Sequence, residues 1–148
     1  MKKFINLREA IEADSAILLE WRNDKTARKN SFSSDRITEK EHQRYMAKLQ
    51  ASSSLRQFIF EYNGMPVGAI REQLLEEMKF KLSYQISPLY GGKKLGQIMM
   101  SLYLIDRSGS FICEVKEGNI SSIKMIEKLG FIKFKTENKV NSYNLQQP

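Results

Sequence analysis

Residues 84–100, which read YQISPLYGGKKLGQIMM, decide the fold of this chain. Alternating apolar residues before position 87 predict a strand, the glycines predict a tight loop, and an apolar stripe from Leu95 onward predicts a helix. The first N–H groups of a helix have no partner within it and lie at the positive end of its dipole, so they bind anions. This segment is therefore expected to hold a phosphate group; the alternative is a basic turn that caps a surface helix.

The loop residues favour anion binding but match no nucleotide-binding motif. Gly91, Gly92 and Gly96 have no side chain to block a ligand, and Lys93 and Lys94 add two cations. The spacing is neither Gly-x-x-x-x-Gly-Lys-Ser/Thr nor Gly-x-Gly-x-x-Gly, so neither the P-loop nor the dinucleotide-binding fingerprint is supported. The loop residues alone do not distinguish a ligand site from a basic turn, so the rest of the sequence is needed to choose between them.

Composition narrows the class of protein. The 148 residues, 41% of them hydrophobic, fit one domain with its own core, and no apolar run reaches the roughly 20 residues that span a bilayer. The first residues lack the apolar run of a signal peptide, so we expect a cytoplasmic protein without a membrane partner. One cysteine and one histidine build neither a disulfide nor a typical zinc site, so no metal is expected. The net charge of +7 is spread along the chain, which argues against nucleic acid and fits a small anionic ligand.

The apolar pattern predicts an alternation of strands and helices. A polar segment at 23–37 is expected to be a loop, Thr38 and Glu41 form a capping box, and the apolar strand at 111–115 is expected to be buried on both faces. In chain order we expect a strand at 4–8, helices at 14–23 and 38–49, strands at 56–62, 67–71 and 79–86, a helix after the glycine loop, a strand at 111–115, a helix from Asn119 that ends at Gly130, and strands at 131–136 and 140–145.

This order of elements, combined with residues 86–96 and residues 119–131, resembles the GCN5-related N-acetyltransferase superfamily over nearly the whole chain. The resemblance implies an α/β (α+β) fold with a mixed, mostly antiparallel sheet of about six to seven strands, flanked by about four helices. It implies acetyl-CoA as co-substrate, with the pyrophosphate on the glycine loop and the pantetheine arm along the preceding strand. The residues that it places at the cofactor are Ile86, Ser87, Gly91, Gly92, Lys93, Lys94, Leu95, Gly96, Asn119 and Ser122.

The sequence departs from the family pattern at three positions. The family loop usually reads Gln/Arg-x-x-Gly-x-Gly/Ala; here Gly91 replaces the Gln or Arg, Lys94 replaces the first glycine, and Gly96 matches the last. Lys94 adds both a Cβ atom and a cation, so the sign of its effect on CoA affinity stays open. Ile126 stands where many relatives carry the tyrosine that protonates the departing thiolate. Water or another phenol, from Tyr84, Tyr90 or Tyr103, is expected to take that role.

The resemblance implies direct attack of an amine on the thioester, and the amine must first lose a proton. Glu72 is the candidate base and Tyr84 the candidate residue that orders a water, while backbone N–H groups near Ile86 polarise the carbonyl. The alternative for Glu72 is a solvated surface charge. For the whole chain, the alternatives are a non-catalytic acyl-CoA-binding module and, more distantly, a nucleic-acid-binding protein.

The acceptor is expected to be a small-molecule amine. Residues 18–24, 28–32 and 41–42 resemble acetyltransferases that act on nucleotide-linked amino sugars, including those of the pseudaminic-acid pathway, and the opening helix also resembles ribosomal-protein N-acetyltransferases. Either a nucleotide-linked amino sugar or a peptide amine is therefore implied, bound by a monomer or a homodimer. The candidate acceptor-binding residues are Arg22, Asn23, Asn30, Ser31 and His42; the alternatives are a solvated loop and a packed histidine.

Overall fold

The computed structural model describes residues 4–91 and 94–148, and a seven-stranded sheet is its central feature. The strands are β1 (Ile5–Glu9), β2 (Leu55–Tyr62), β3 (Met65–Glu76), β4 (Lys79–Ile86), β5 (Gly109–Lys116), β6 (Ile132–Glu137) and β7 (Val140–Gln147). They lie in the order β1-β2-β3-β4-β5-β7-β6, and every neighbouring pair is antiparallel except the parallel pair β4 and β5. The predicted mixed, mostly antiparallel sheet is therefore confirmed.

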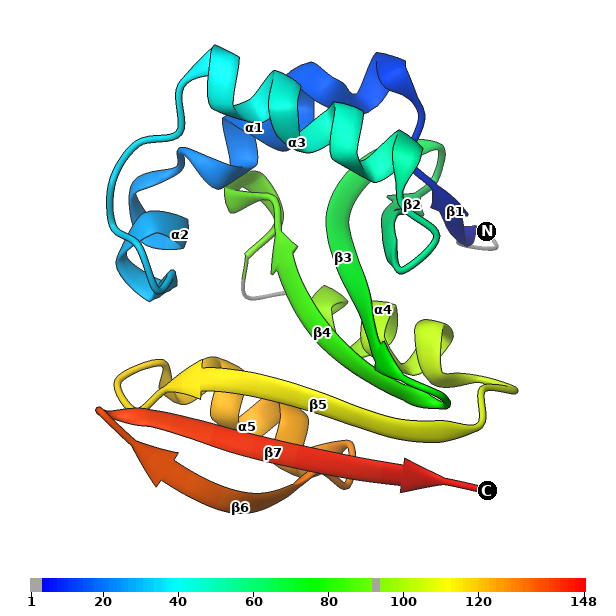
Figure 1. Ribbon diagram of the computed structural model, residues 1–148, viewed down its shortest axis with the longest axis vertical. Helices are drawn as coiled ribbons and strands as arrows, with labels where there is room; N and C mark the ends of the chain where they lie inside the picture. Colours follow the sequence, from blue (N-terminus) through cyan, green and yellow to red (C-terminus); the bar gives the residue numbers. More distant parts are fainter. Residues whose placement is uncertain (1–3, 92–93) are drawn as a thin grey trace.

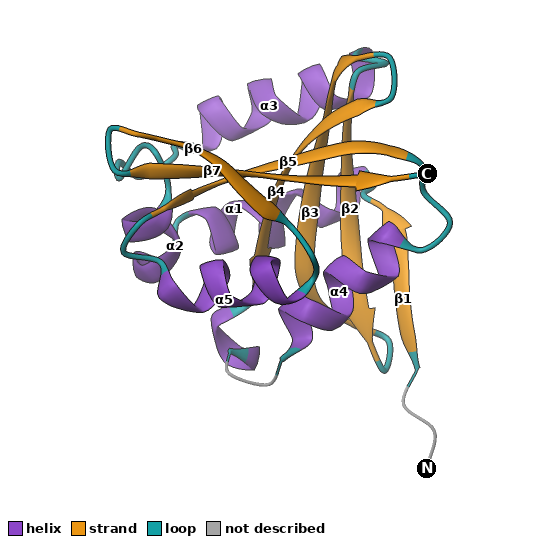
Figure 2. Cartoon of the chain, turned by 90° about the horizontal axis from the view of Figure 1, so that it is seen from below, coloured by secondary structure: helices purple, strands orange, loops and turns teal. Residues whose placement is uncertain are grey.

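Helices cover both faces of this sheet (Figure 1 and Figure 2). They are α1 (Ser15–Arg22), α2 (Lys25–Asn30), α3 (Glu39–Ala51), α4 (Leu95–Leu104) and α5 (Ile120–Lys128), with short 3-10 turns at η1 (Glu12–Asp14) and η2 (Pro88–Tyr90). In the described part of the chain, no helix is both long and apolar enough to cross a membrane. The α/β architecture expected from the sequence is thus confirmed as well.

Each face has its own hydrophobic cluster. On one face, α1 and α3 pack Leu18, Trp21 and Met46 against Ile59 of β2 and Ala69 of β3. On the other face, α4 and α5 pack against a larger cluster that runs from β2 to β7. Members of this cluster include Phe58, Phe60, Ile70, Leu82, Met99, Tyr103, Phe111, Cys113, Ile126 and Tyr143. The sheet therefore separates two different packing environments, one under α1 and α3 and one under α4 and α5.

The parallel pair β4–β5 separates along its length. Residues 79–82 of β4 pair with residues 110–113 of β5, and no pairing between these strands continues beyond Leu82 and Cys113. Residues 83–86 remain paired with β3 on their other side. Figure 1 shows the two strands together near the β3–β4 turn and apart at the end that leads into η2. One edge of β4 therefore has backbone polar groups without a strand partner beside it.

Two local predictions were wrong. The segment 23–37 contains α2, which begins because the Asp24 carboxylate accepts hydrogen bonds from the backbone N–H groups of Thr26 and Ala27, at 3.1 and 3.2 Å. Strand β5 is not buried on both faces, because Cys113 and its neighbours at odd positions are buried whereas Glu114 and the other even positions are half-buried. The capping box of Thr38 and Glu41 is confirmed.

Candidate active site

The end of β4, the turn η2 and the start of α4 form a continuous site. Ser87 is buried, its N–H donates to the carbonyl of Val67 at 2.8 Å, and its Oγ accepts from the N–H of Leu89 at 3.4 Å. This cap turns the chain out of β4 and into η2, after which α4 begins at Leu95. Six predicted cofactor residues thus lie between the end of β4 and the first turn of α4, namely Ile86, Ser87, Gly91, Lys94, Leu95 and Gly96, whereas Gly92 and Lys93 lie outside the described residues.

The protein's own packing does not require glycine at positions 91 and 96. A Cβ atom at Gly91 would lie 3.9 Å from its nearest neighbour, the carbonyl of Pro88, and one at Gly96 would lie 3.6 Å from Ile86. By contrast, a Cβ atom at Gly68 would meet Ile86 at 2.7 Å. A Cβ atom at either position would make only ordinary van der Waals contacts with the described residues, so neither glycine is needed to avoid a clash within the protein.

Lys94 takes the left-handed backbone conformation, which glycine adopts most readily. Its φ is 58° and its ψ is 17°, and it is the N-cap residue of α4. Such a backbone is strained for a residue with a Cβ atom. The lysine therefore keeps the glycine-like turn at the start of α4 and adds a positive charge there.

Tyr84 lies where β4 and β5 separate, two residues beyond the last pair. Its hydroxyl is hydrogen-bonded to Oγ of Ser122 on α5. Burial raises the pKa of Tyr84 well above its usual value, and the bond to Ser122 opposes that shift only in part. The structure thus brings together a predicted catalytic residue and a predicted cofactor residue. Asn119 lies at the N-cap position of α5, where its side chain makes no capping hydrogen bond.

Tyr103, another of the candidate phenols, and Ile126 both lie within the core. Tyr103 of α4 is 1% exposed and donates its hydroxyl to Glu72, and Ile126 of α5 is completely buried. Glu72 is itself 3% exposed and also accepts from Nη1 of Arg107 at 2.8 Å. Glu72 is therefore a buried ion-pair partner on the α4 face, and its position does not favour the base function that the sequence predicted.

A polar group lies on the opposite face, under α1 and α3. The Arg22 guanidinium lies 5.1 Å from the centroid of the Tyr45 ring, and the Tyr45 hydroxyl donates to Oε1 of Gln57 at 2.5 Å. In β3, Nη2 of Arg71 donates to Oγ of Ser83 at 3.4 Å. Of the predicted acceptor-binding residues, Arg22 is therefore the one that joins a polar cluster on the sheet.

The remaining predicted acceptor residues have structural partners or lie on α2. The Asn23 side chain accepts from the N–H of Ile37 at 2.6 Å and donates to its carbonyl at 2.8 Å, which ties the two ends of the segment together. His42 is 2% exposed, and its Nε2 lies 2.8 Å from the carbonyl oxygen of Ser15. Burial lowers the pKa of His42. Asn30 and Ser31 lie at the C-terminal end of α2.

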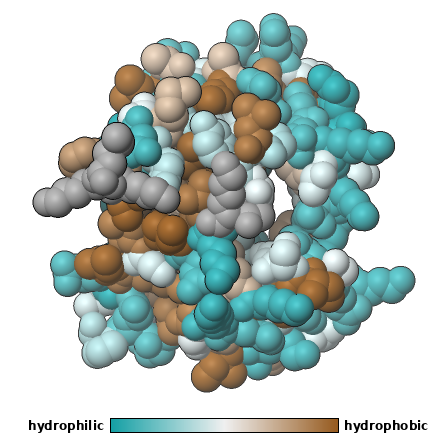
Figure 3. Space-filling model, turned by 180° about the vertical axis from the view of Figure 1, so that it is seen from behind, coloured by the Kyte–Doolittle hydropathy of each residue, from teal (hydrophilic) through white to brown (hydrophobic). Residues whose placement is uncertain are grey.

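Sequence reasoning missed Glu114. This residue follows Cys113, the last residue of β5 that pairs with β4, and its carboxylate forms an ion pair with Lys81 of β4. Its even position places it on the face of Arg71 and Ser83 and opposite Cys113. The available signal was that Glu114 is charged within the otherwise apolar stretch 111–115. Figure 3 views the molecule from behind and shows an opening near the middle of that face.

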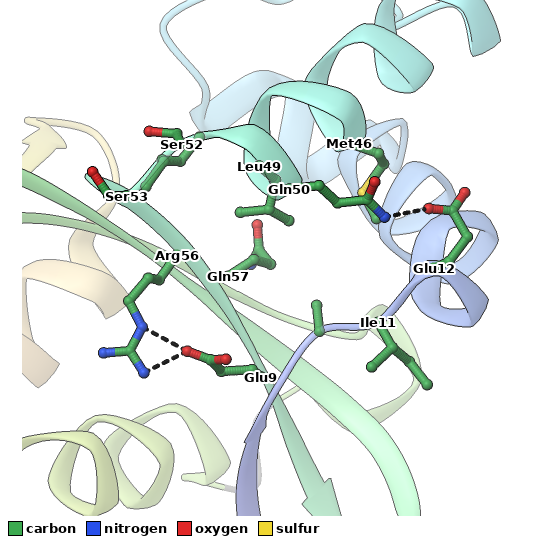
Figure 4. A pocket seen from close by; sticks show the side chains of 12 residues that line it. Glu9, Ile11, Glu12, Met46, Leu49, Gln50, Ser52, Ser53, Arg56 and Gln57 are labelled. Carbon is green, nitrogen blue, oxygen red and sulfur yellow. Dashed lines mark hydrogen bonds and ion pairs between the residues drawn. The ribbon is translucent and has the colours of Figure 1, made fainter.

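Two cavities lie outside this site. One of about 390 Å³ lies between the β1–α1 connection, α3 and the start of β2, and is bordered by the pairs Arg56–Glu9 and Gln50–Glu12 (Figure 4). The other, of about 390 Å³, runs along the outer side of α4 from Lys94 to Ile105. Among the described residues, no group of three or more Cys, His, Asp or Glu side chains could hold a metal ion.

Comparisons with known proteins establish the fold. No family model matches the sequence, and no curated protein matches it. Among solved structures, a domain from Methanocaldococcus jannaschii has a TM-score of 0.83 and 22% identity, over 98% of this chain and 99% of that one. Spermidine N-acetyltransferase from Vibrio cholerae, in complex with CoA and spermine, has a TM-score of 0.82 and 15% identity, over 97% and 95%.

A third structure supports the same conclusion. Campylobacter jejuni N-acetyltransferase PseH, in complex with acetyl coenzyme A, has a TM-score of 0.75 and 18% identity, over 98% of this chain and 100% of that one. The likeness covers nearly the whole length of each chain. The chain therefore has the fold of the GCN5-related N-acetyltransferases, as its sequence predicted.

Proposed function

We propose that this protein is an N-acetyltransferase that moves an acetyl group from acetyl-CoA to a primary amine of a small molecule. One observation carries the proposal. The N-terminus of α4, which carries Lys94 and Gly96, follows η2 and β4, and the outer edge of β4 has no strand partner from residue 83 onward. The same fold binds CoA or acetyl-CoA in the Vibrio cholerae and Campylobacter jejuni structures.

The residues of this chain fit acetyl-CoA, which would supply the acetyl group as a thioester. The backbone N–H groups at the start of α4, with the charges of Lys93 and Lys94, would hold the pyrophosphate. The free edge of residues 83–86 would hydrogen-bond the pantetheine arm, and an N–H group near Ile86 would polarise the carbonyl. Ser122 and Asn119 would contact the arm from α5.

Tyr84 is the proposed proton donor to the departing thiolate. A tyrosine hydroxyl is protonated at neutral pH, and the hydrogen bond with Ser122 holds the Tyr84 hydroxyl in place. Tyr103 is engaged by Glu72 within the core, and Ile126 has no proton to give. The geometry thus favours Tyr84 over Tyr103.

Glu114 replaces Glu72 as the proposed group that receives the amine. Amines are protonated at neutral pH, so the site must bind an ammonium group and take its proton, directly or through water. Glu114 is half-buried at the point where the strands separate, whereas Glu72 is buried on the other face with Arg107 beside it. The Lys81–Glu114 pair would open when the ammonium group displaces the Lys81 side chain.

The acceptor is proposed to bind under α1 and α3, on the face of the sheet that carries Arg22, Asn30 and Ser31. The basic residues of this region support a nucleotide-linked amino sugar, because its diphosphate is anionic; a peptide amine is the alternative. A non-catalytic acyl-CoA-binding module is the second candidate function, because Ile126 removes the usual proton donor.

Calorimetric titration of acetyl-CoA, followed by release of the free thiol with a panel of amines, tests the proposal. We expect saturable binding, and thiol release with at least one amine, UDP-linked amino sugars being tested first. Binding without release from any amine would favour the non-catalytic module. The absence of binding by the folded protein would contradict both functions.

A matched pair of variants at Gly91 tests the position of the pyrophosphate. Position 91 has room for a side chain, so both Gly91→Asp and Gly91→Asn are expected to fold. The aspartate places a negative charge beside the pyrophosphate, and the asparagine has nearly the same shape without that charge. We expect acetyl-CoA affinity to be at least about 10-fold lower for Gly91→Asp than for Gly91→Asn. Equal affinities would place the pyrophosphate elsewhere.

A further inference from the structure

A row of polar side chains crosses the sheet on the face covered by α1 and α3. The register aligns Gln57 of β2 with Arg71 of β3, and Arg71 with Ser83 of β4. Since Leu82 pairs with Cys113, the next position of β5 in this row is Glu114. Arg71 and Glu114 are thus separated by more than two strand spacings, that is by more than about 10 Å between their backbones, because β4 and β5 separate beyond Leu82 and Cys113. Within this row Arg71 carries a positive charge and Glu114 carries a negative charge.

A second guanidinium group on this face, besides that of Arg71, belongs to Arg22. Arg22 of α1 lies 5.1 Å from the centroid of the Tyr45 ring. Burial raises the pKa of Tyr45, and the charges of Arg71 and Arg22 oppose that shift, so both arginines lie near the same phenol. Burial lowers the pKa of Arg22, and the charge of Arg71 lowers it further. Two like charges are therefore held close together in a half-buried place.

Among the described residues, neither of these two arginines forms an ion pair with a carboxylate. Arg8, Arg56 and Arg107 each have a carboxylate within 4.0 Å, but within residues 4–91 and 94–148 neither Arg22 nor Arg71 has one. Glu41, the carboxylate whose charge acts on Arg22, is bonded to Thr38 at the start of α3. Two half-buried arginines have lost part of their hydration. Without a counterion this loss costs free energy, unless a ligand brings negative charge.

We propose that the acceptor amine carries a carboxylate or a phosphate, and that Arg22 and Arg71 bind this anion while Glu114 receives the amine. The inference rests on the proposed function and specifies its substrate class. Guanidinium groups suit both anions, because they donate two parallel hydrogen bonds to either. A polycation such as the spermine bound in the Vibrio cholerae enzyme would meet the two arginines and is excluded as a substrate.

Anion titration of the CoA-saturated protein tests the site without knowledge of the natural acceptor. Bound CoA blocks the glycine loop, so added inorganic phosphate or succinate reports on the second site. We expect saturable binding of at least one of the two probes, read from the Nε–H signals of the arginines by NMR. The affinity should fall at least about 10-fold in Arg71→Met and Arg22→Met. Arg44→Met, an exposed position on α3, is the control and should bind as the unmodified protein does.

The outcomes separate this inference from the proposed function. Failure of CoA itself to bind would contradict the proposed function, whereas normal CoA binding without phosphate or succinate binding would overturn this inference alone. Preference for phosphate over succinate would assign a phosphorylated acceptor, and the reverse preference a carboxylated one. Equal binding in Arg71→Met would also overturn the assignment.

Turnover with matched amines gives a second readout. The pairs are glucosamine 6-phosphate with glucosamine, and 4-aminobutanoate with butylamine, with spermidine as the polycation. We expect thiol release to be at least about 10-fold faster with an anionic member than with its neutral partner, and the difference to vanish in Arg71→Met. Equal rates within both pairs, or faster release with spermidine, would overturn the inference.

Discussion

Tyr84 is the residue on which the proposed chemistry depends most. Removal of its hydroxyl in Tyr84→Phe keeps the ring that packs against the core and removes the proton donor. We expect kcat to fall by about 100-fold or more while acetyl-CoA affinity stays the same, because general acid catalysis contributes about 10²-fold or more. Steady-state kinetics with calorimetry of acetyl-CoA binding measures both quantities.

Tyr103→Phe is the matched control for this prediction. This variant removes the Tyr103 hydroxyl but leaves Tyr84 in place, so kcat should be retained. Its cost should appear in the free energy of unfolding, by about 1 to 3 kcal/mol, because Glu72 loses a buried hydrogen bond. A normal kcat in Tyr84→Phe, or a loss of kcat confined to Tyr103→Phe, would contradict the assignment.

Single residues also mark the limit of sequence reasoning. The anion-binding loop could be predicted because its glycines and lysines are neighbours in the sequence. The surroundings of Glu72 could not, because its partners Tyr103 and Arg107 lie 31 and 35 residues further along the chain. Glu114 was missed for the same reason: its importance depends on where β4 and β5 separate, and strand pairing is a tertiary property.

At the scale of elements, the start of α4 combines a strained turn with a charge. Lys94→Gly relieves the strain of the left-handed conformation, so the free energy of unfolding should rise by up to about 1 kcal/mol. It also removes a cation beside the proposed pyrophosphate, so acetyl-CoA affinity should fall several-fold, as expected for about 0.3–1 kcal/mol of charge interaction. Thermal unfolding and calorimetry measure the two effects.

Met78→Gly separates these two effects. Met78 has the same φ of 58° in the turn between β3 and β4, away from α4. The free energy of unfolding should rise in Met78→Gly as it does in Lys94→Gly, while acetyl-CoA affinity should not change. If Lys94→Gly bound acetyl-CoA as tightly as Met78→Gly, the charge of Lys94 would have no part in binding.

The elements themselves were predictable where local signals are strong. The capping box of α3 and the alternation of β4 gave elements close to those observed, since both signals are confined to a few neighbouring residues. Helix α2 was missed because it has six residues and none of them is buried, so no apolar period marks it. Its only sequence signal is the Asp24 cap, which also occurs in turns.

At the scale of the whole molecule, one strand pair joins two parts of the sheet. Strands β1–β4 lie on one side of the β4–β5 pair and strands β5–β7 on the other, and that pair spans residues 79–82 and 110–113. A ligand between the separated ends would add the contacts that the strands lack. Acetyl-CoA should therefore stabilise the whole fold, by about 2.7 kcal/mol when present at 100 times its Kd.

Amide hydrogen exchange locates this effect within the sheet. The free edge of residues 83–86 should exchange fast without a ligand and slow at least about 10-fold with acetyl-CoA, because the pantetheine arm takes the place of the missing strand. Residues 79–82 are paired on both sides in either state and act as the internal control. Equal slowing in both segments would indicate general stabilisation instead. Slowing confined to residues 83–86 would place the arm along β4, and no slowing there would contradict the binding mode even if calorimetry detects acetyl-CoA.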